Sequence, residues 1–229
     1  MGLFNRHIKI ADSGLFNGRT DWHCHILPGV DDGFKTMEDS LAALARYEQI
    51  GIKEVWLTPH IMEDIPNRTG ALKERFTELS LAYKGPLRLH LASENMMDVI
   101  FGQRLEAGDL LSLKDKRLLV ETSYFNPPIG MDGILKAVKS KGYFPLLAHP
   151  ERYMYMDDRR YKELKSMEIE FQLNIGSLTG SYGPEVKSKA EHLLDAGMYE
   201  YSGTDLHRLS SLEHMLGAEL KKKIIKLIP

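Results

Sequence analysis

The sequence predicts an α/β fold in which seven parallel strands alternate with helices within one domain. Short apolar runs alternate with longer stretches of helical periodicity, as in β/α units. No linker or low-complexity segment interrupts the 229 residues. Polar side chains repeatedly follow the apolar runs, where a parallel sheet places its functional edge. Seven units in about 200 residues favour a closed or nearly closed barrel over an open sheet.

The N-terminal half contains the first three strands and two long helices. Apolar runs predict strands at 21–26, 54–58 and 87–92. The first helix is expected over 36–51, because Thr36 opens a capping-box pattern and Gly51 is a natural stop. The second helix is expected over 70–83, where apolar side chains recur at helical spacing. A short helical or irregular segment is expected over 97–107.

The C-terminal half continues the same alternation. Strands are predicted at 117–121, 144–148, 170–174 and 199–202. Gly142 ends one of the intervening helices, and Pro184 begins another. Helices are predicted at 132–140, 157–167, 184–196 and 212–225. The expected domain is therefore 1–229, with a core of about 20–208.

Composition excludes several classes of protein. A net charge of -2 gives no broad basic field, so nucleic acid is not an expected partner. No apolar run approaches the roughly 20 residues of a membrane span, so stable membrane insertion is not expected. Residues 1–7 lack the apolar stretch of a signal peptide, and Arg6 does not fit a myristoylation pattern. These features predict a cytoplasmic protein.

Cys24 is the only cysteine, so an intrachain disulfide is impossible, which fits a reducing compartment. It lies between two histidines, which could activate a thiol nucleophile. On a strand, however, its side chain would point away from both. The following residues also lack the arginine that a cysteine phosphatase needs. We therefore interpret Cys24 as a buried apolar residue.

The strongest functional signal is a set of metal-ligand residue types at the carboxyl ends of the predicted strands. His23 and His25 lie on one strand with period-two spacing, so both imidazoles face the same side. Similar residues follow the later strands, and in a parallel barrel these ends meet at one rim. The candidate metal ligands are His23, His25, Asp32, His60, Glu94, Glu121, His149, Asp205 and His207.

Five imidazoles and four carboxylates exceed the ligands that a single ion requires. Two or three divalent ions fit this inventory better. Mixed imidazole and carboxylate ligation suits Mn²⁺, Fe²⁺ or Zn²⁺. Clustered divalent ions generate hydroxide at neutral pH and hold transferring oxygens. Phosphoester hydrolysis is the reaction class that most often uses both properties.

The motifs that carry these residues resemble those of the polymerase-and-histidinol-phosphatase (PHP) superfamily. Within it, they are most similar to the bacterial manganese-dependent protein tyrosine phosphatases of capsule and exopolysaccharide loci. The resemblance spans about 21–207, and it implies a distorted (β/α)7 TIM-like barrel with a trinuclear site. The motifs read TDWHCH at 20–25, LPGVDDG at 27–33, TPH at 58–60, LAHPERY at 147–153 and GTDLH at 203–207.

The resemblance also implies roles for individual residues. His23, His25 and Asp205 would hold one ion, and Asp32, His60 and His207 would hold a third. A second ion would be bound by His149 with Glu94 and Glu121, which either hold it or are shared with it, and the division of these two glutamates between ions stays open. Asp31 would brace its turn. Arg152 would bind a phosphate oxygen, with Arg208 as a second clamp. A metal-held hydroxide would attack phosphorus, and a metal-bound water or His207 would supply the leaving-group proton. Tyr153 and Tyr155 would either floor the pocket or belong to a rim loop.

The expected function is hydrolysis of phosphotyrosine with Mn²⁺ as cofactor, or with Fe or Zn. The expected partner is the phosphotyrosine tail of a bacterial tyrosine kinase that controls capsule or exopolysaccharide synthesis. Two alternatives remain open. One is a small-molecule phosphomonoesterase such as a histidinol phosphatase. The other is a non-catalytic regulatory module.

Overall fold

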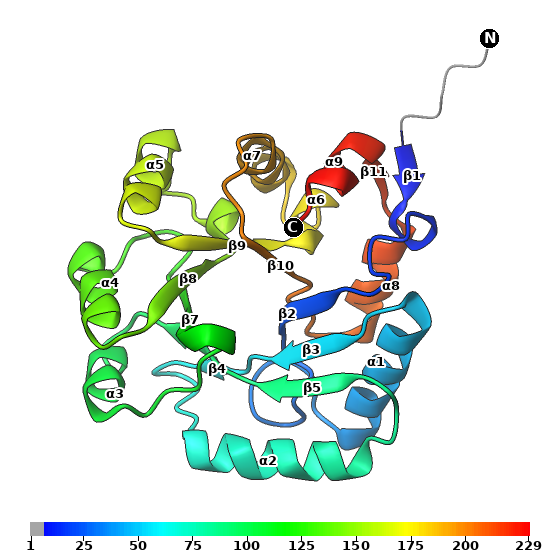
Figure 1. Ribbon diagram of the computed structural model, residues 1–229, viewed down its shortest axis with the longest axis horizontal. Coiled ribbons are helices and arrows are strands. Elements are labelled where there is room, and N and C mark those ends of the chain that lie inside the picture. The colour runs from blue at the N-terminus through cyan, green and yellow to red at the C-terminus, as the bar shows by residue number, and fades with distance from the viewer. Residues whose placement is uncertain (1–6) are drawn as a thin grey trace.

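The computed structural model describes residues 7–229 and contains all seven predicted strands (Figure 1). Residues 1–6, which include most of the N-terminal segment considered for a signal peptide or myristoylation, lie outside the described residues. The predicted strands are β2 (Thr20–Cys24), β3 (Glu54–Leu57), β5 (Arg88–Leu91), β7 (Arg117–Glu121), β8 (Phe144–Ala148), β9 (Glu170–Asn174) and β10 (Tyr201–Gly203). The additional strands are β1 (His7–Lys9), β4 (His60–Ile61), β6 (Glu94–Met96) and β11 (Glu219–Lys221).

The α/β class is confirmed, but the parallel strands form a curled half-barrel sheet, so the expectation of a closed or nearly closed barrel is wrong. They divide into a six-stranded sheet, ordered β10-β9-β8-β7-β6-β4, and a three-stranded sheet, ordered β2-β3-β5. The division falls where β3 breaks before β4, at Thr58-Pro59, because proline has no N–H to donate to the ladder. On the other side of β2, an isolated bridge joins Cys24, the last residue of β2, to Leu206, which follows β10.

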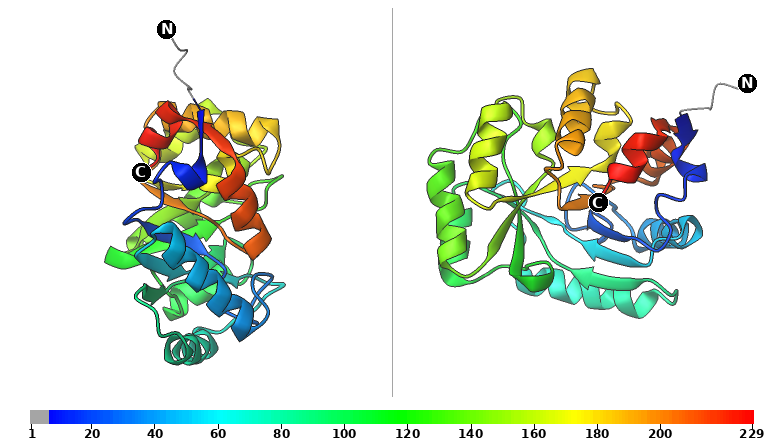
Figure 2. Two further views of the ribbon diagram at one scale, coloured as in Figure 1. Left: turned by 90° about the vertical axis from the view of Figure 1, so that its right-hand side faces the viewer. Right: turned by 45° about the horizontal axis from the view of Figure 1, so that its top comes forward.

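Helices lie around the outside of this curled sheet (Figures 1 and 2). The first follows its predicted signals, since the Thr36 hydroxyl accepts a hydrogen bond from the Asp39 amide and Gly51 ends the helix at φ 94°. Along residues 7–229, every helix is too short or too polar to cross a bilayer. The helices are α1 (Met37–Ile50), α2 (Thr69–Ala82), α3 (Phe101–Ala107), α4 (Met131–Ser140), α5 (Asp158–Ser166), α6 (Ile175–Leu178), α7 (Pro184–Asp195), α8 (Leu209–Gly217) and α9 (Lys222–Leu227).

The last predicted helix, 212–225, is not continuous. Helix α8 ends at Gly217, strand β11 follows, and α9 begins at Lys222. The strand forms because it pairs antiparallel with β1, with His7 opposite Lys221. This pairing joins segments near the two ends of the described chain. The contact between distant segments therefore determines the structure at 219–221, although the local sequence pattern favours a helix.

The inner face of the curled sheet has an apolar half and a polar half. A small apolar cluster, separate from the main core, contains Trp56, Ala92, Leu113, Leu119, Leu146 and Ala148. Side chains alternate along a strand, so Leu119 and Glu121 of β7 point to the same face. Strand β7 therefore passes from the apolar cluster at Leu119 to the polar Glu121 at its carboxyl end.

Candidate metal centre

Four donor atoms converge where β2 ends. The Nε2 atoms of His23 and His25 lie 3.1 Å apart, and both side chains are fully buried. The Oε2 atom of Glu94 lies 3.1 Å from His23 Nε2 and 3.3 Å from His25 Nε2. Asp205 Oδ1 lies 3.4 and 3.3 Å from the same two nitrogens. Two imidazoles and two carboxylates thus direct donor atoms at one small volume.

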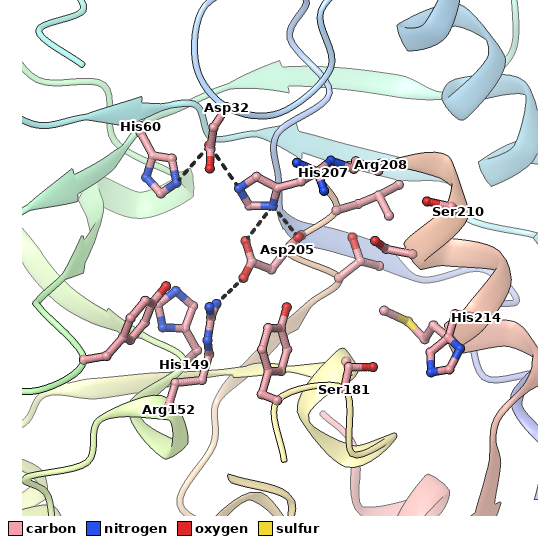
Figure 3. A pocket seen from close by; sticks show the side chains of 17 residues that line it. Asp32, His60, His149, Arg152, Ser181, Asp205, His207, Arg208, Ser210 and His214 are labelled. Carbon is pink, nitrogen blue, oxygen red and sulfur yellow. Dashed lines mark hydrogen bonds and ion pairs between the residues drawn. The ribbon is translucent and has the colours of Figure 1, made fainter. Parts of the chain in front are cut away.

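Two further groups of donors adjoin this one. In the second group, the Nδ1 atom of His60 lies 3.1 Å from Glu94 Oε2 and 2.9 Å from Glu121 Oε1. The third group places Asp32 Oδ1 3.3 Å from His207 Nε2 and 3.6 Å from His60 Nε2 (Figure 3). His25 also belongs to the third group. Within each group the donor atoms lie within 4.8 Å of one another, a spacing able to hold an ion.

The three groups share residues, so they form one continuous centre. His25 and Glu94 each belong to two groups, and so does His60. Eight of the nine predicted ligands are members. The ninth, His149, directs its Nε2 atom to Glu94 Oε1 at 3.0 Å. It lies at the turn after β8, where its backbone takes a left-handed φ of 33°.

The chemistry of these donors fits divalent cations. Among the described residues, buried His60 Nδ1, Glu94 Oε2 and Glu121 Oε1 lie close together but form no hydrogen bond of acceptable geometry. Such orphaned atoms are costly unless a cation or proton satisfies them. Burial raises the pKa of the Glu94 and Asp205 carboxyls, but His23 and its neighbours outweigh burial and hold both well below their usual range. Both carboxylates are therefore charged and available as ligands.

Two residues orient the imidazoles of His23 and His25. Asp31 Oδ2 accepts a hydrogen bond from His25 Nδ1 at 2.8 Å, and another from the His60 backbone amide. Asp31 therefore does more than brace its turn. Gln172 Oε1 accepts from His23 Nδ1 at 3.0 Å. These bonds leave the Nε2 lone pairs directed at the centre. Sequence reasoning missed Gln172, whose only signal is a polar residue within an apolar strand.

Beside the centre lies a cavity of about 700 Å³. It extends from the metal-ligand residues to Ser210 and His214 on α8 (Figure 3). Arg152 lines it and donates from Nη1 to Asp205 Oδ2 at 2.7 Å. Arg208 is exposed and lines the same cavity. The geometry thus places both predicted arginines beside the candidate ligands.

The cavity has a different aromatic lining from the one considered in the sequence. Tyr153 is buried, and its hydroxyl bonds to the Thr122 amide and the Ala148 carbonyl. The tyrosines that line the cavity are Tyr124 and Tyr182. They come from two loops distant in sequence, so no periodic pattern could have identified them.

Cys24 lies away from this chemistry. Its side chain is fully buried, and its thiol donates to the Trp56 carbonyl at 3.5 Å. Burial raises the pKa of this thiol well above its ordinary value. These observations support the interpretation of Cys24 as a small buried residue rather than a nucleophile.

The fold and the site together define an α/β protein with linked, buried clusters of His, Asp and Glu able to bind metal. The family model for capsular polysaccharide synthesis, CpsB/CapC, matches residues 19–223, and the chain belongs to this family.

Relatives with names and solved structures extend this result. The chain is 29% identical to tyrosine-protein phosphatase YwqE of Bacillus subtilis (strain 168), over 83% of this chain and 78% of that protein. It is 28% identical to tyrosine-protein phosphatase CpsB of Streptococcus pneumoniae, over 83% of this chain and 84% of that one. A crystal structure from work on YwqE and CpsB, described as unique metal-dependent tyrosine phosphatases, matches with a TM-score of 0.78 at 28% identity. That match covers 84% of this chain and 81% of the solved one.

Proposed function

We propose that the protein is a metal-dependent protein tyrosine phosphatase. The observation that carries the proposal is the linked set of three donor groups beside a cavity that Arg152 lines. The relatives named as tyrosine phosphatases cover most of the chain, which supports the same activity. We assign the metal to His23, His25, Asp32, His60, Glu94, Glu121, His149, Asp205 and His207. We further propose Mn²⁺ as the native ion in two or three copies, with Fe or Zn as alternatives.

The chain's own groups account for substrate binding. When bound, the divalent ions supply hydroxide at neutral pH and compensate charge on the phosphoryl oxygens. Burial lowers the pKa of Arg152, but Asp205 more than offsets burial, so the guanidinium stays charged. Its planar edge can hold a phosphoryl oxygen, with Arg208 as a second cation.

The leaving group requires little help. A tyrosine phenol has a reference pKa of about 10, so its phenolate leaves more readily than an alkoxide. The leaving-group proton would come from water at the ion site or from His207, which lines the cavity. The second route requires that His207 Nε2 carries a proton instead of an ion. The Nδ1 atom of His207 lies 2.8 Å from the Asp205 carbonyl, which fixes the orientation of the ring.

The proposal extends to the setting of the enzyme. We propose that residues 1–229 form one catalytic domain of the PHP type, and that it acts in the cytoplasm on the phosphotyrosine tail of a bacterial tyrosine kinase. The membership of the capsular polysaccharide synthesis family supports such a partner. A single, buried cysteine is compatible with a reducing compartment.

A substrate panel tests the proposed activity against its alternatives. Metal-loaded protein is assayed with a tyrosine phosphopeptide, histidinol phosphate and a sugar phosphate. We expect the highest kcat/KM with the phosphopeptide. A higher kcat/KM with histidinol phosphate would favour a small-molecule phosphatase. Absence of turnover with every substrate would favour a regulatory module.

A further inference from the structure

Two tyrosine rings contact the guanidinium of Arg152 within the cavity. The central carbon Cζ lies 4.2 Å from the centroid of the Tyr182 ring and 4.5 Å from that of Tyr124. Contacts of this length between a guanidinium and an aromatic face are cation–π interactions. A ring that covers a face of the guanidinium leaves the N–H groups on its edge free to bind oxygen. The rings therefore restrict the arginine without using its hydrogen-bond donors.

A closed chain of contacts fixes the Tyr182 ring. Asn174 Nδ2 donates to the Tyr182 hydroxyl at 3.2 Å and to Asp205 Oδ2 at 2.9 Å. Asp205 Oδ2 also accepts from Arg152. The chain thus runs from Tyr182 through Asn174 and Asp205 to Arg152, and returns to the Tyr182 ring.

The surroundings of Tyr182 support a local role. It lies in the loop between α6 and α7 and is 40% exposed, so its side chain is not part of the main core. The ring sits against Gly176, where an added Cβ would stand 3.4 Å from Tyr182 Cε2. At that distance an added methyl group would be in ordinary van der Waals contact with the ring.

We propose that Tyr182 is a positioning residue that holds the Arg152 guanidinium in place for an incoming phosphoryl group, with Tyr124 as a second support. This inference rests on the proposed role of Arg152 as the phosphate-binding residue. The aromatic ring acts in this role, and the hydroxyl serves only to tie the loop to Asn174. Removal of the ring therefore weakens anion binding and leaves the metal centre intact.

The test measures binding of inorganic phosphate to metal-loaded protein by calorimetry, together with metal content. We expect Tyr182→Leu to raise the phosphate Kd about tenfold, within the range of a cation–π contact. Tyr182→Phe keeps the ring and should bind phosphate as the unmodified protein does. With a phosphopeptide, Tyr182→Leu should raise KM by a similar factor and change kcat less. All variants should bind the same number of ions per chain.

A matched control comes from a second arginine–tyrosine pair. The guanidinium carbon of Arg117 lies 5.2 Å from the centroid of the Tyr201 ring, and this ring packs against the apolar cluster. Tyr201→Leu removes an equivalent ring that does not line the cavity, and should leave the phosphate Kd unchanged. A tenfold weakening in this control would show a general loss of stability and overturn the proposal.

Other outcomes distinguish a failure of the proposed role of Tyr182 from a failure of the proposed role of Arg152. If Arg152→Met weakens phosphate binding and Tyr182→Leu does not, the role of Tyr182 is wrong while that of Arg152 stands. If Arg152→Met has no effect, the phosphate-binding assignment itself fails, and the inference fails with it. If Tyr182→Phe is as weak as Tyr182→Leu, the hydroxyl acts rather than the ring, which also overturns the proposal. Loss of metal from Tyr182→Leu would indicate a structural role and contradict it.

Discussion

The inner face of the curled sheet buries apolar side chains at one end and ionisable side chains at the other. At one end, Trp22 stacks on Trp56 with ring centroids 5.9 Å apart, and Tyr201 meets Trp22 edge-on at 4.9 Å. At the other end, the same strands or their immediate continuations present His60 and Asp205. The first end buries apolar area, which stabilises the fold. The second buries ionisable groups, which costs free energy unless a partner compensates.

This difference indicates what each end is for. Desolvated imidazoles and carboxylates are a weak source of stability, and replacing such a set by apolar residues is often neutral. The ligand end is therefore best explained by binding of cations, whereas the aromatic end is best explained by folding. Substitutions at the two ends should separate activity from stability.

The largest effect is expected from removing two facing ligands. His23→Ala combined with Asp205→Ala deletes an imidazole and the carboxylate 3.4 Å from it. Turnover should fall by at least about a thousandfold, on the scale of losing a central catalytic group. The double change also leaves Arg152 and Asn174 without their shared acceptor, so the melting temperature of the metal-free protein is measured beside turnover to confirm that the variant is folded. Turnover that survives in this variant would contradict the assignment of the centre.

A smaller effect is expected from Asp31, which orients a ligand without belonging to the three donor groups. Asp31→Ala removes the acceptor 2.8 Å from His25 Nδ1 and frees the ring to rotate. Metal affinity should fall roughly 10- to 100-fold, as for other partners of ligating histidines. Metal titration measures this change. Gln172→Leu should lower the metal affinity similarly, because it removes the acceptor for His23. If both variants bind metal as tightly as the unmodified protein, neither Asp31 nor Gln172 orients a ligand.

The pH dependence of metal binding is the third test. Burial lowers the pKa of His23, but the Glu94 and Asp205 carboxylates raise it to about 9. At neutral pH the Nε2 atom of His23 therefore carries a proton, which must leave before this nitrogen can bind a metal ion. Metal affinity should rise about tenfold per pH unit between about pH 7 and 9 for each proton released. The raised pKa also stabilises the metal-free fold below about pH 6.5, and this stability is lost as the pH rises through 9. Metal titrations in that range check the slope, and a flat profile would contradict it.

The smallest effect on activity is expected at the aromatic end. Trp56 is 8% exposed and contacts both Trp22 and His90. Trp56→Ala should lower the free energy of unfolding by about 3–5 kcal/mol. The kcat of the folded, metal-loaded fraction should stay within about twofold of the unmodified protein's, because Trp56 belongs to the apolar cluster and does not line the cavity. Denaturant unfolding and active-site-normalised kinetics measure the two effects. A large loss of kcat in fully folded protein would contradict the claim that the aromatic end contributes to stability and not to catalysis.

Much of this arrangement could be predicted from the sequence, because it depends on local signals. Strand positions follow from short apolar runs, and the rim follows from polar residues at their ends, as with His60 and Glu121. The metal-ligand assignments remain predictions, although the structure brings the nine residues together.

The features that the sequence did not predict depend on contacts between distant segments. The prediction of a closed barrel was wrong because the number of strands does not reveal which strands pair. The ladder breaks at Thr58-Pro59, and the strands divide there into two sheets. The break after Gly217 arises from pairing with residues 7–9. Tyr124 and Tyr182 meet Arg152 from separate loops, and neither loop carries a periodic pattern.

The central claim is that the linked donor groups bind metal and support hydrolysis of phosphotyrosine. The most direct measurement is the number and identity of ions in protein purified without chelators, with turnover of a tyrosine phosphopeptide recorded on the same sample. We expect two or three divalent ions per chain, and turnover that disappears when a chelator removes them and returns when Mn²⁺ is added. Fewer than one ion per chain after careful loading, or no turnover in a fully loaded sample, would contradict the account.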